Sequence, residues 1–161
     1  MTDSAHTPPQ EPLAFIGGGN MASAIIGGLI RQGLPASAID VVEPFEEARA
    51  RLRQSFGIQA MATPGPQLQR ATLVVWAVKP QMYKEAALQA RTHLAQPLHL
   101  SVMAGIRSES LAARMSTERV VRCMPNTPAL VGQGITALFA RAGATAADRA
   151  RIEHVIATTG E

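Results

Sequence analysis

The sequence is poor in several residue types, and each shortage excludes a class of protein. Cys123 is the single cysteine in 161 residues, so no internal disulfide can form, which fits a reducing, cytoplasmic location. Aromatic residues make up only 4% of the chain, too few for platforms on which nucleic-acid bases stack. The net charge of +3 comes from scattered arginines without a basic run, so we expect no nucleic-acid partner. No apolar run approaches the length of a membrane span, so we expect no membrane partner either.

Further shortages concern the N-terminus and the metal-binding residues. The segment MTDSAHTPPQEP has no basic region followed by an apolar one, so it is not a signal peptide. We expect a disordered tail over residues 1–12 and one folded domain over residues 13–161. The four histidines are scattered without ligand spacing, so we predict no metal site. Cys123 has no histidine or cysteine nearby and is interpreted as a buried apolar residue, not a nucleophile.

Short apolar runs alternate with helical patterns along the rest of the chain. The predicted strands are 13–16, 39–43, 58–61 (a weak one), 72–78, 98–102, 119–124 and 135–139. The predicted helices are 21–32, 44–57, 81–94, 108–115 and 145–158, with a short helix or turn at 64–70. Pro44 is expected to open the second helix and Gly57 to end it, and Ser108 is expected to cap the helix that runs through Met115. The last helix opens with Thr145 and Asp148 in a near capping box. A loop is expected over 125–134. This alternation predicts an α/β, doubly wound, mostly parallel, Rossmann-like sheet with helices on both faces.

Residues 17–22, GGGNMA, form a G-x-G-x-x-A motif between the first predicted strand and helix. Gly17 would make the tight turn, Gly19 would let the backbone approach a pyrophosphate, and Ala22 would let the helix pack on the strand. The amides of residues 18–21 would then point at the anion, helped by the helix dipole. The alternative is a tight structural turn. A methyltransferase fits less well, because Phe15 and Ile16 stand where its acidic residue is usual.

Three further polar residues lie at the end of a predicted strand or just after it. Glu43 could accept the ribose hydroxyls of NAD and repel a 2′-phosphate, or be an exposed carboxylate beside a helix start. Lys79 is placed to meet a phosphate or the nicotinamide side, or to be a solvated lysine at a strand end. Asn126 stands between Pro125 and Pro128, which would fix its amide; the alternative is an Asx-turn.

The segments FIGGGNMASAIIGGLI, AVKP, SVMAGI and VRCMPNTPALVGQGIT together resemble Δ1-pyrroline-5-carboxylate reductase, over residues 13–161. The CMPNTP piece with the following VGQGIT is the most specific. The resemblance implies reduction of the cyclic imine 1-pyrroline-5-carboxylate to L-proline, the last step of proline synthesis, with hydride from NADPH or NADH.

The resemblance also implies where the cofactor binds. The implied contacts are Ile16, Gly17, Gly18, Gly19, Asn20, Met21, Glu43, Pro44, Pro64, Ala77, Val78, Lys79, Pro80, Val102, Met103, Ala104 and Asn126. No catalytic residue is expected within these 161 residues. Some members carry serine or arginine where this chain has Glu43. Glu43 therefore favours NADH, although the sequence alone does not decide between NADH and NADPH.

The resemblance implies that members of the family continue into an all-helical domain, which we expect to be absent from these 161 residues. In the family that domain carries the substrate loop, the proton-donating hydroxyls and the main homo-oligomer interface. We therefore expect a fragment that binds cofactor without turnover and has an apolar patch at its last helix and the CMPNTP loop. Two alternatives stay open: a dehydrogenase of the hydroxyacid type, and a non-catalytic nucleotide-binding module.

Overall fold

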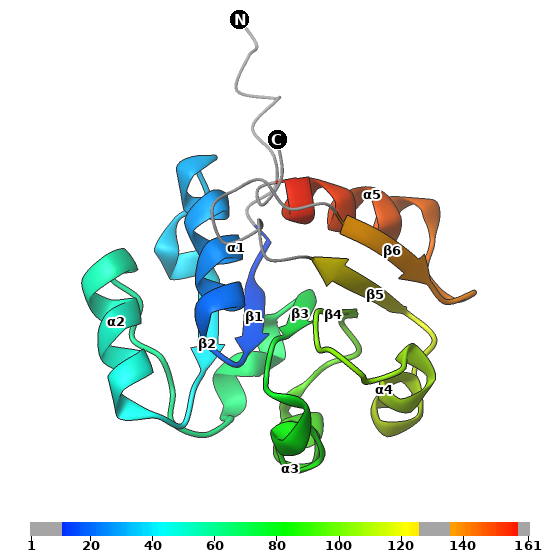
Figure 1. Ribbon diagram of the computed structural model, residues 1–161, viewed down its shortest axis with the longest axis horizontal. Helices are drawn as coiled ribbons and strands as arrows, with labels where there is room; N and C mark the ends of the chain where they lie inside the picture. The colour runs from blue at the N-terminus through cyan, green and yellow to red at the C-terminus, as the bar shows by residue number, and fades with distance from the viewer. Residues whose placement is uncertain (1–10, 126–135, 158–161) are drawn as a thin grey trace, which may run out of the picture.

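A six-stranded sheet forms the middle layer of the molecule (Figure 1). The computed structural model describes residues 11–125 and 136–157. The strand order is β2-β1-β3-β4-β5-β6, in which the first five strands are parallel and β6 runs antiparallel to β5. The strands are β1 (Leu13–Ile16), β2 (Ile39–Val42), β3 (Leu73–Trp76), β4 (Leu98–Ser101), β5 (Val120–Pro125) and β6 (Thr136–Ala140). The predicted doubly wound α/β fold is confirmed.

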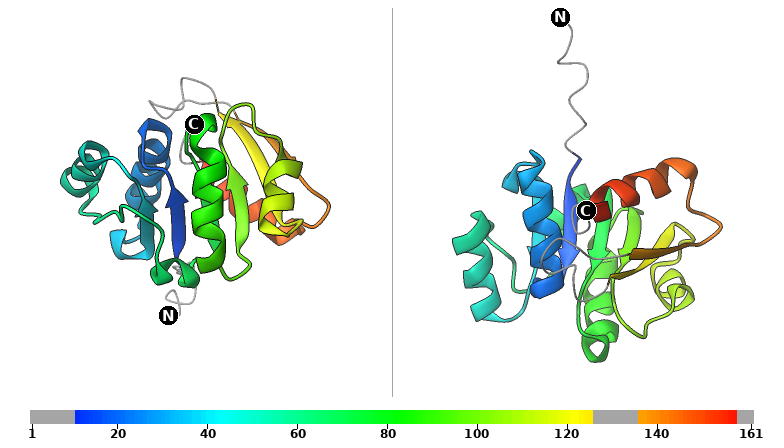
Figure 2. Two further views of the ribbon diagram at one scale, coloured as in Figure 1. Left: turned by 90° about the horizontal axis from the view of Figure 1, so that it is seen from below. Right: turned by 45° about the horizontal axis from the view of Figure 1, so that its top comes forward.

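Helices cover both faces of this sheet, as Figures 1 and 2 show. They are α1 (Asn20–Arg31), α2 (Glu46–Phe56), α3 (Tyr83–Ala90), α4 (Ser108–Met115) and α5 (Ala146–Ile156). Helices α1 and α5 pack on one face, with α2 beside α1 at the β2 edge, while α3 and α4 pack on the other. None of the helices in the described part of the chain is long and apolar enough to cross a membrane.

Side chains of the central strands alternate between two separate cores. In β1, Leu13 and Phe15 join the core under α1 and α5, whereas Ala14 and Ile16 join the core under α3 and α4. All four residues of β1 and of β3 are buried. A strand covered on both faces needs a continuous apolar run, which is the pattern that predicted these strands.

Helix α2 begins two residues later than predicted. Pro44 does not open it, because Phe45 is still extended (φ −91°, ψ 127°) and the helix starts at Glu46. The Glu43 carboxylate accepts a hydrogen bond from the Phe45 amide at 3.0 Å and holds this stretch out of the helix. The Phe45 side chain lies outside the core and is 58% exposed. Gly57 ends the helix as predicted, with φ +73°.

Several other boundaries also differ from the prediction. Residues 58–61 are not a strand: Met61 makes one parallel bridge to Val42, and Pro64 and Pro66 soon follow without amides to extend it. Ser108 is the first residue of α4 and not its cap, since the preceding Arg107 is extended and no side chain caps the helix. The helix predicted at 81–94 is helical at α3 and has a 3₁₀ turn at each end, Pro80–Met82 and Arg91–His93.

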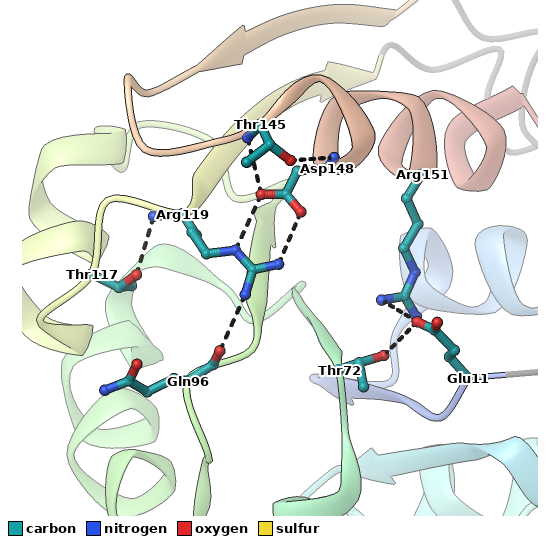
Figure 3. A network of polar contacts seen from close by, with 8 residues as sticks. All are labelled: Glu11, Thr72, Gln96, Thr117, Arg119, Thr145, Asp148 and Arg151. Atoms are coloured by element: carbon teal, nitrogen blue, oxygen red, sulfur yellow. Dashed lines mark hydrogen bonds and ion pairs between the residues drawn. The ribbon is translucent and has the colours of Figure 1, made fainter.

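Two arginines fasten α5 near the start of the strands (Figure 3). Arg119 donates two hydrogen bonds to Asp148, at 2.9 and 3.1 Å, and a third to the carbonyl of Gln96. Asp148 also completes the predicted capping box with Thr145. The Arg119 guanidinium, more than any other group, lowers the pKa of the Asp148 carboxyl. Arg151 pairs with Glu11 at 3.1 Å, and so ties α5 to the residues that lead into β1.

The expected tail over 1–12 lies largely outside the described residues, which begin at Glu11. The amide of Thr72 donates to the carbonyl of Pro12 at 3.0 Å, so the last residue of that segment is fixed beside the start of β3. The loop expected over 125–134 and its Asn126 also lie outside the described residues, except for Pro125 at the end of β5.

Candidate functional site

A cleft opens at the carboxyl ends of the parallel strands, where the winding of the sheet changes direction. The chain passes from β1 to β2 on one side and then returns to β3 on the other side of β1. In open α/β sheets this switch point leaves a crevice outside the strand ends. A cleft of about 670 Å³ lies there, lined by the β1–α1 turn, the β2–α2 turn, the segment around Pro64, and the stretch from Ala77 into α3.

The cleft brings together about half of the residues predicted for the site. Those that line it are Ile16, Gly17, Gly19, Glu43, Pro44, Pro64, Ala77, Val78 and Lys79. Gly18, Asn20, Met21 and Pro80 are their chain neighbours but do not line it. Residues 102–104 follow β4, the next strand beyond β3, and also lie outside the cleft lining.

Gly17 is required by the fold itself. Its φ is +105°, a region that side-chain-bearing residues avoid, and a Cβ there would lie 2.6 Å from the Ala77 carbonyl oxygen. Its amide donates to the Val42 carbonyl at 2.8 Å, and the Ala77 amide donates to the Ile16 carbonyl at 2.8 Å. This glycine therefore lets the ends of β1, β2 and β3 close against each other.

Gly19 has a different environment. A Cβ built on Gly19 would meet nothing within 4 Å, and the residue lines the cleft. Gly19 is also the residue before α1, where no side chain caps the helix and the first turn holds no acidic residue. The positive end of the α1 dipole and its uncapped amides thus meet open space large enough for an anion.

Glu43 is buried, with 6% of its surface exposed, so the alternative of an exposed carboxylate beside a helix start is wrong. Its Oε1 accepts the Gly18 amide at 2.8 Å, and its Oε2 accepts the Phe45 amide at 3.0 Å. The Gly18 amide is therefore already used within the protein. The expectation that the amides of residues 18–21 all point at a bound anion is therefore wrong for Gly18.

Lys79 lines the cleft and is exposed. It follows β3 in an extended conformation (φ −65°, ψ 145°) that ends at the Pro80 turn. The cleft holds a second cation, Arg51 of α2, and the carboxylates of Glu46, Glu47 and Glu85 besides that of Glu43.

Several cleft residues were missed by the sequence reasoning. They are Val42, Phe45, Glu46, Glu47, Ala48, Arg51, Ala62, Met82, Glu85, Ala86 and Gln89. A signal existed for the last four: their spacing marks one face of the helix predicted at 81–94, while Tyr83, Ala87 and Ala90 face the core. Phe45 also carried a signal, as an apolar residue directly after a strand-end carboxylate and proline.

A buried polar pair joins β3 and β4. The Trp76 Nε1–H donates to His99 Nδ1 at 2.9 Å, and Tyr83 packs edge-on against Trp76 with ring centroids 6.3 Å apart. Burial, and secondarily the charge of Arg119, lowers the pKa of His99 to about 4. His99 is thus neutral at pH 7 and able to accept the tryptophan hydrogen bond.

Cys123 is fully buried in the core, as expected of an apolar residue. Over residues 11–125 and 136–157, no group of three or more histidine, cysteine, aspartate or glutamate side chains is arranged to hold a metal ion.

Known proteins resemble this chain over most of its length. Residues 12–105 match the family described as NADP oxidoreductase coenzyme F420-dependent. Pyrroline-5-carboxylate reductase of Pseudomonas aeruginosa is 42% identical over 151 residues, 92% of this chain and 55% of the relative. The enzyme of that name from Escherichia coli is 35% identical over 156 residues, 94% of this chain and 58% of the relative.

Solved structures agree with these relatives. The structure of a pyrroline-5-carboxylate reductase from Coxiella burnetii superposes with a TM-score of 0.87 at 28% identity, over 94% of this chain and 57% of that one. The chain therefore spans about half the length of the relatives it matches. The family description names NADP, in agreement with the predicted nicotinamide dinucleotide. By this match, the chain belongs to the NADP oxidoreductase coenzyme F420-dependent family, and its relatives include the pyrroline-5-carboxylate reductases.

Proposed function

We propose that the cleft binds NADH or NADPH and that the chain is the cofactor-binding part of a pyrroline-5-carboxylate reductase. The observation that carries the first half is the open space at Gly19, in front of the uncapped start of α1. Backbone amides at a helix start, with no side chain in the way, suit a pyrophosphate. The cleft volume of about 670 Å³ is within the usual range for a small-molecule or cofactor site.

Each wall of the cleft then has a role. Gly19, with the amides of residues 20 and 21, would hold the pyrophosphate, and Glu43 would meet the ribose of the adenosine half. Pro44 and Pro64 flank that end, where the adenosine would lie. Ala77 and Val78 form the wall on the β3 side, and Lys79 supplies a positive charge beside the phosphates or the nicotinamide.

The nicotinamide end would extend toward the turn after β4. That turn, 102–104, is fixed: the Val102 amide donates to the Trp76 carbonyl at 3.0 Å, and the Met103 amide to Ser101 Oγ at 3.3 Å. A reduced nicotinamide supplies hydride, which would add to the imine carbon while the nitrogen takes up a proton. We assign substrate binding and the proton donor to groups outside these 161 residues, so the chain alone would bind cofactor without turnover.

The substrate is proposed from the relatives, which carry the name pyrroline-5-carboxylate reductase at up to 42% identity. We also propose a cytoplasmic enzyme that assembles into homo-oligomers when complete. The strongest support for reduction of an imine is the combination of the cleft with these relatives. The cleft alone also fits other dehydrogenases of this architecture.

Two experiments test the two halves of this proposal. Isothermal titration calorimetry of the purified chain with NADH and with NADPH is expected to show saturable binding to one site. Deletion of the encoding gene in its host is expected to give a strain that grows only with added L-proline. A deletion strain that grows without proline contradicts the substrate assignment and favours a hydroxyacid dehydrogenase or a non-catalytic module. Absence of binding by a folded sample contradicts the cofactor assignment.

A further inference from the structure

The Glu43 side chain is fixed in place before any ligand binds. Both carboxylate oxygens accept backbone amides, from Gly18 at 2.8 Å and from Phe45 at 3.0 Å. Its own amide donates to the Met61 carbonyl at 2.8 Å, and its carbonyl accepts from Arg49 Nη1 at 2.8 Å. The residue thus connects the glycine turn, the β2–α2 turn and the segment that pairs beside β2. The Glu43 carboxylate cannot rotate away from a ligand without breaking its hydrogen bonds to the amides of Gly18 and Phe45.

The same carboxylate lines the cleft at the carboxyl end of β2. Each of its oxygens uses one acceptor position on a protein amide and keeps another, so a ribose with two free hydroxyls can still donate to it. A phosphate on the ribose would instead bring acceptor oxygens and negative charge against a buried carboxylate. The two ligands therefore meet opposite electrostatic conditions at this point.

The surrounding charges reinforce this difference. Glu46 and Glu47 line the same end of the cleft, against one arginine of the lining, Arg51, which is exposed. Arg49 is nearby but its guanidinium Nη1 donates to the carbonyls of Glu43 and Pro44, both at 2.8 Å. The three carboxylates Glu43, Glu46 and Glu47 against the two arginines Arg49 and Arg51 leave this corner with one net negative charge.

We propose that Glu43 makes this chain selective for the cofactor without a 2′-phosphate, so that it binds NADH more tightly than NADPH. This inference rests on the proposed function. The preference for NADH differs from what the family description, which names NADP, would suggest on its own. Glu43 acts as a specificity-determining residue because a fixed, buried carboxylate cannot reorient to relieve repulsion by the added phosphate.

Calorimetric dissociation constants for NADH and NADPH, measured on the wild type and on Glu43→Gln, test the inference. The wild type is expected to favour NADH by at least about tenfold. In Glu43→Gln the ratio of the two constants is expected to move toward NADPH by at least about fivefold, since the charge is gone. Glu153→Gln removes an exposed carboxylate of α5, outside the cleft, and is expected to leave the ratio unchanged.

The ratio remains informative even if Glu43→Gln loosens the glycine turn, because both cofactors then lose affinity together. Tighter NADPH binding by the wild type, or an unchanged ratio in Glu43→Gln, overturns the inference and leaves the proposed function standing. If neither cofactor binds to the folded wild type, the proposed function fails and this inference fails with it.

Discussion

At the scale of single residues, the glycine motif combines two different demands. Gly17 serves the fold, since its positive φ and its approach to Ala77 leave no space for a side chain. Gly19 has space for a Cβ and an ordinary φ of −83°, so the fold alone does not explain it. The glycine at position 19 is explained by the closeness of a ligand, which is what the motif predicted.

Gly19→Ala therefore separates ligand binding from folding. We expect its free energy of unfolding to stay within about 1 kcal/mol of the wild type, because the new methyl meets no atom. Its affinity for NADH and NADPH should fall by at least about tenfold, because the methyl occupies the space proposed for the pyrophosphate. Chemical denaturation and calorimetry measure the two quantities.

Gly65→Ala is the matched control for this change. Gly65 also precedes a helical turn in extended conformation (φ −145°), and its Cβ would also meet nothing within 4 Å. It does not line the cleft. Equal loss of affinity in both variants, or full affinity in Gly19→Ala, would contradict the assignment of the pyrophosphate to Gly19.

The second prediction at this scale concerns His99, whose pKa falls from 6.5 to about 4 on folding. Below pH 6.5 His99 is protonated in the unfolded chain, whereas in the folded chain it stays neutral until the pH falls to about 4. Stability should therefore be fully present above pH 6.5 and decrease as the pH falls to about 4, by up to roughly 3 kcal/mol in total. Denaturant unfolding across this pH range measures the slope.

His99→Gln keeps an acceptor for the Trp76 indole but cannot titrate, so it should flatten this slope. His154→Gln changes an exposed histidine of α5 and should leave the slope as it is in the wild type. A slope that persists in His99→Gln would assign the pH dependence to other groups.

At the scale of elements, one carboxylate contributes twice to the attachment of α5. Asp148 caps the helix with Thr145 and accepts two hydrogen bonds from Arg119 (Figure 3). Asp148→Ala should lower the free energy of unfolding by about 2 kcal/mol, since both the cap and the ion pair are lost. Thr145→Ala should cost about 1 kcal/mol, because it removes only half of the capping box.

The pH dependence of this contribution has a definite sign. Because the folded pKa of Asp148 lies below its ordinary 3.8, its stabilisation is present above that value and is lost as the pH falls through the folded pKa. Thermal unfolding at several pH values measures it. Glu153→Ala, on the same helix but exposed, is the control and should change little. A loss in Glu153→Ala as large as that in Asp148→Ala would contradict the role given to the cap.

The success of the sequence prediction varied between elements for physical reasons. β1, β3 and α5 were predictable because a local signal determines each: an apolar run buried on both faces, or a capping box. The start of α2 was not, because a side chain from the end of β2 takes the Phe45 amide, and only the fold brings these groups together. The same hydrogen bond helps to bury the Glu43 carboxylate. From periodicity and position alone, Glu43 could be either a partner of the ribose or an exposed carboxylate.

At the scale of the whole molecule, the strand order creates the site. Placing β1 between β2 and β3 brings Gly19, Glu43 and Lys79 to one cleft, although they are far apart in sequence. The sequence predicted a mostly parallel sheet and the polar residues at the strand ends, and its spacing marks the face of α3 turned away from the core. It did not predict that this face would form the opposite wall of the cleft. That wall depends on how α3 sits on the sheet, which no local pattern specifies.

The central claim is that this cleft holds a nicotinamide dinucleotide. Trp76 tests it most directly, since it is the single tryptophan of the sequence, is fully buried, and directly precedes the cleft residue Ala77. Titration with NADH should quench its emission saturably and produce sensitised emission from the reduced nicotinamide, and Gly19→Ala should weaken both. Unchanged tryptophan emission from a folded sample, across the full range of NADH and NADPH concentrations, would contradict the claim.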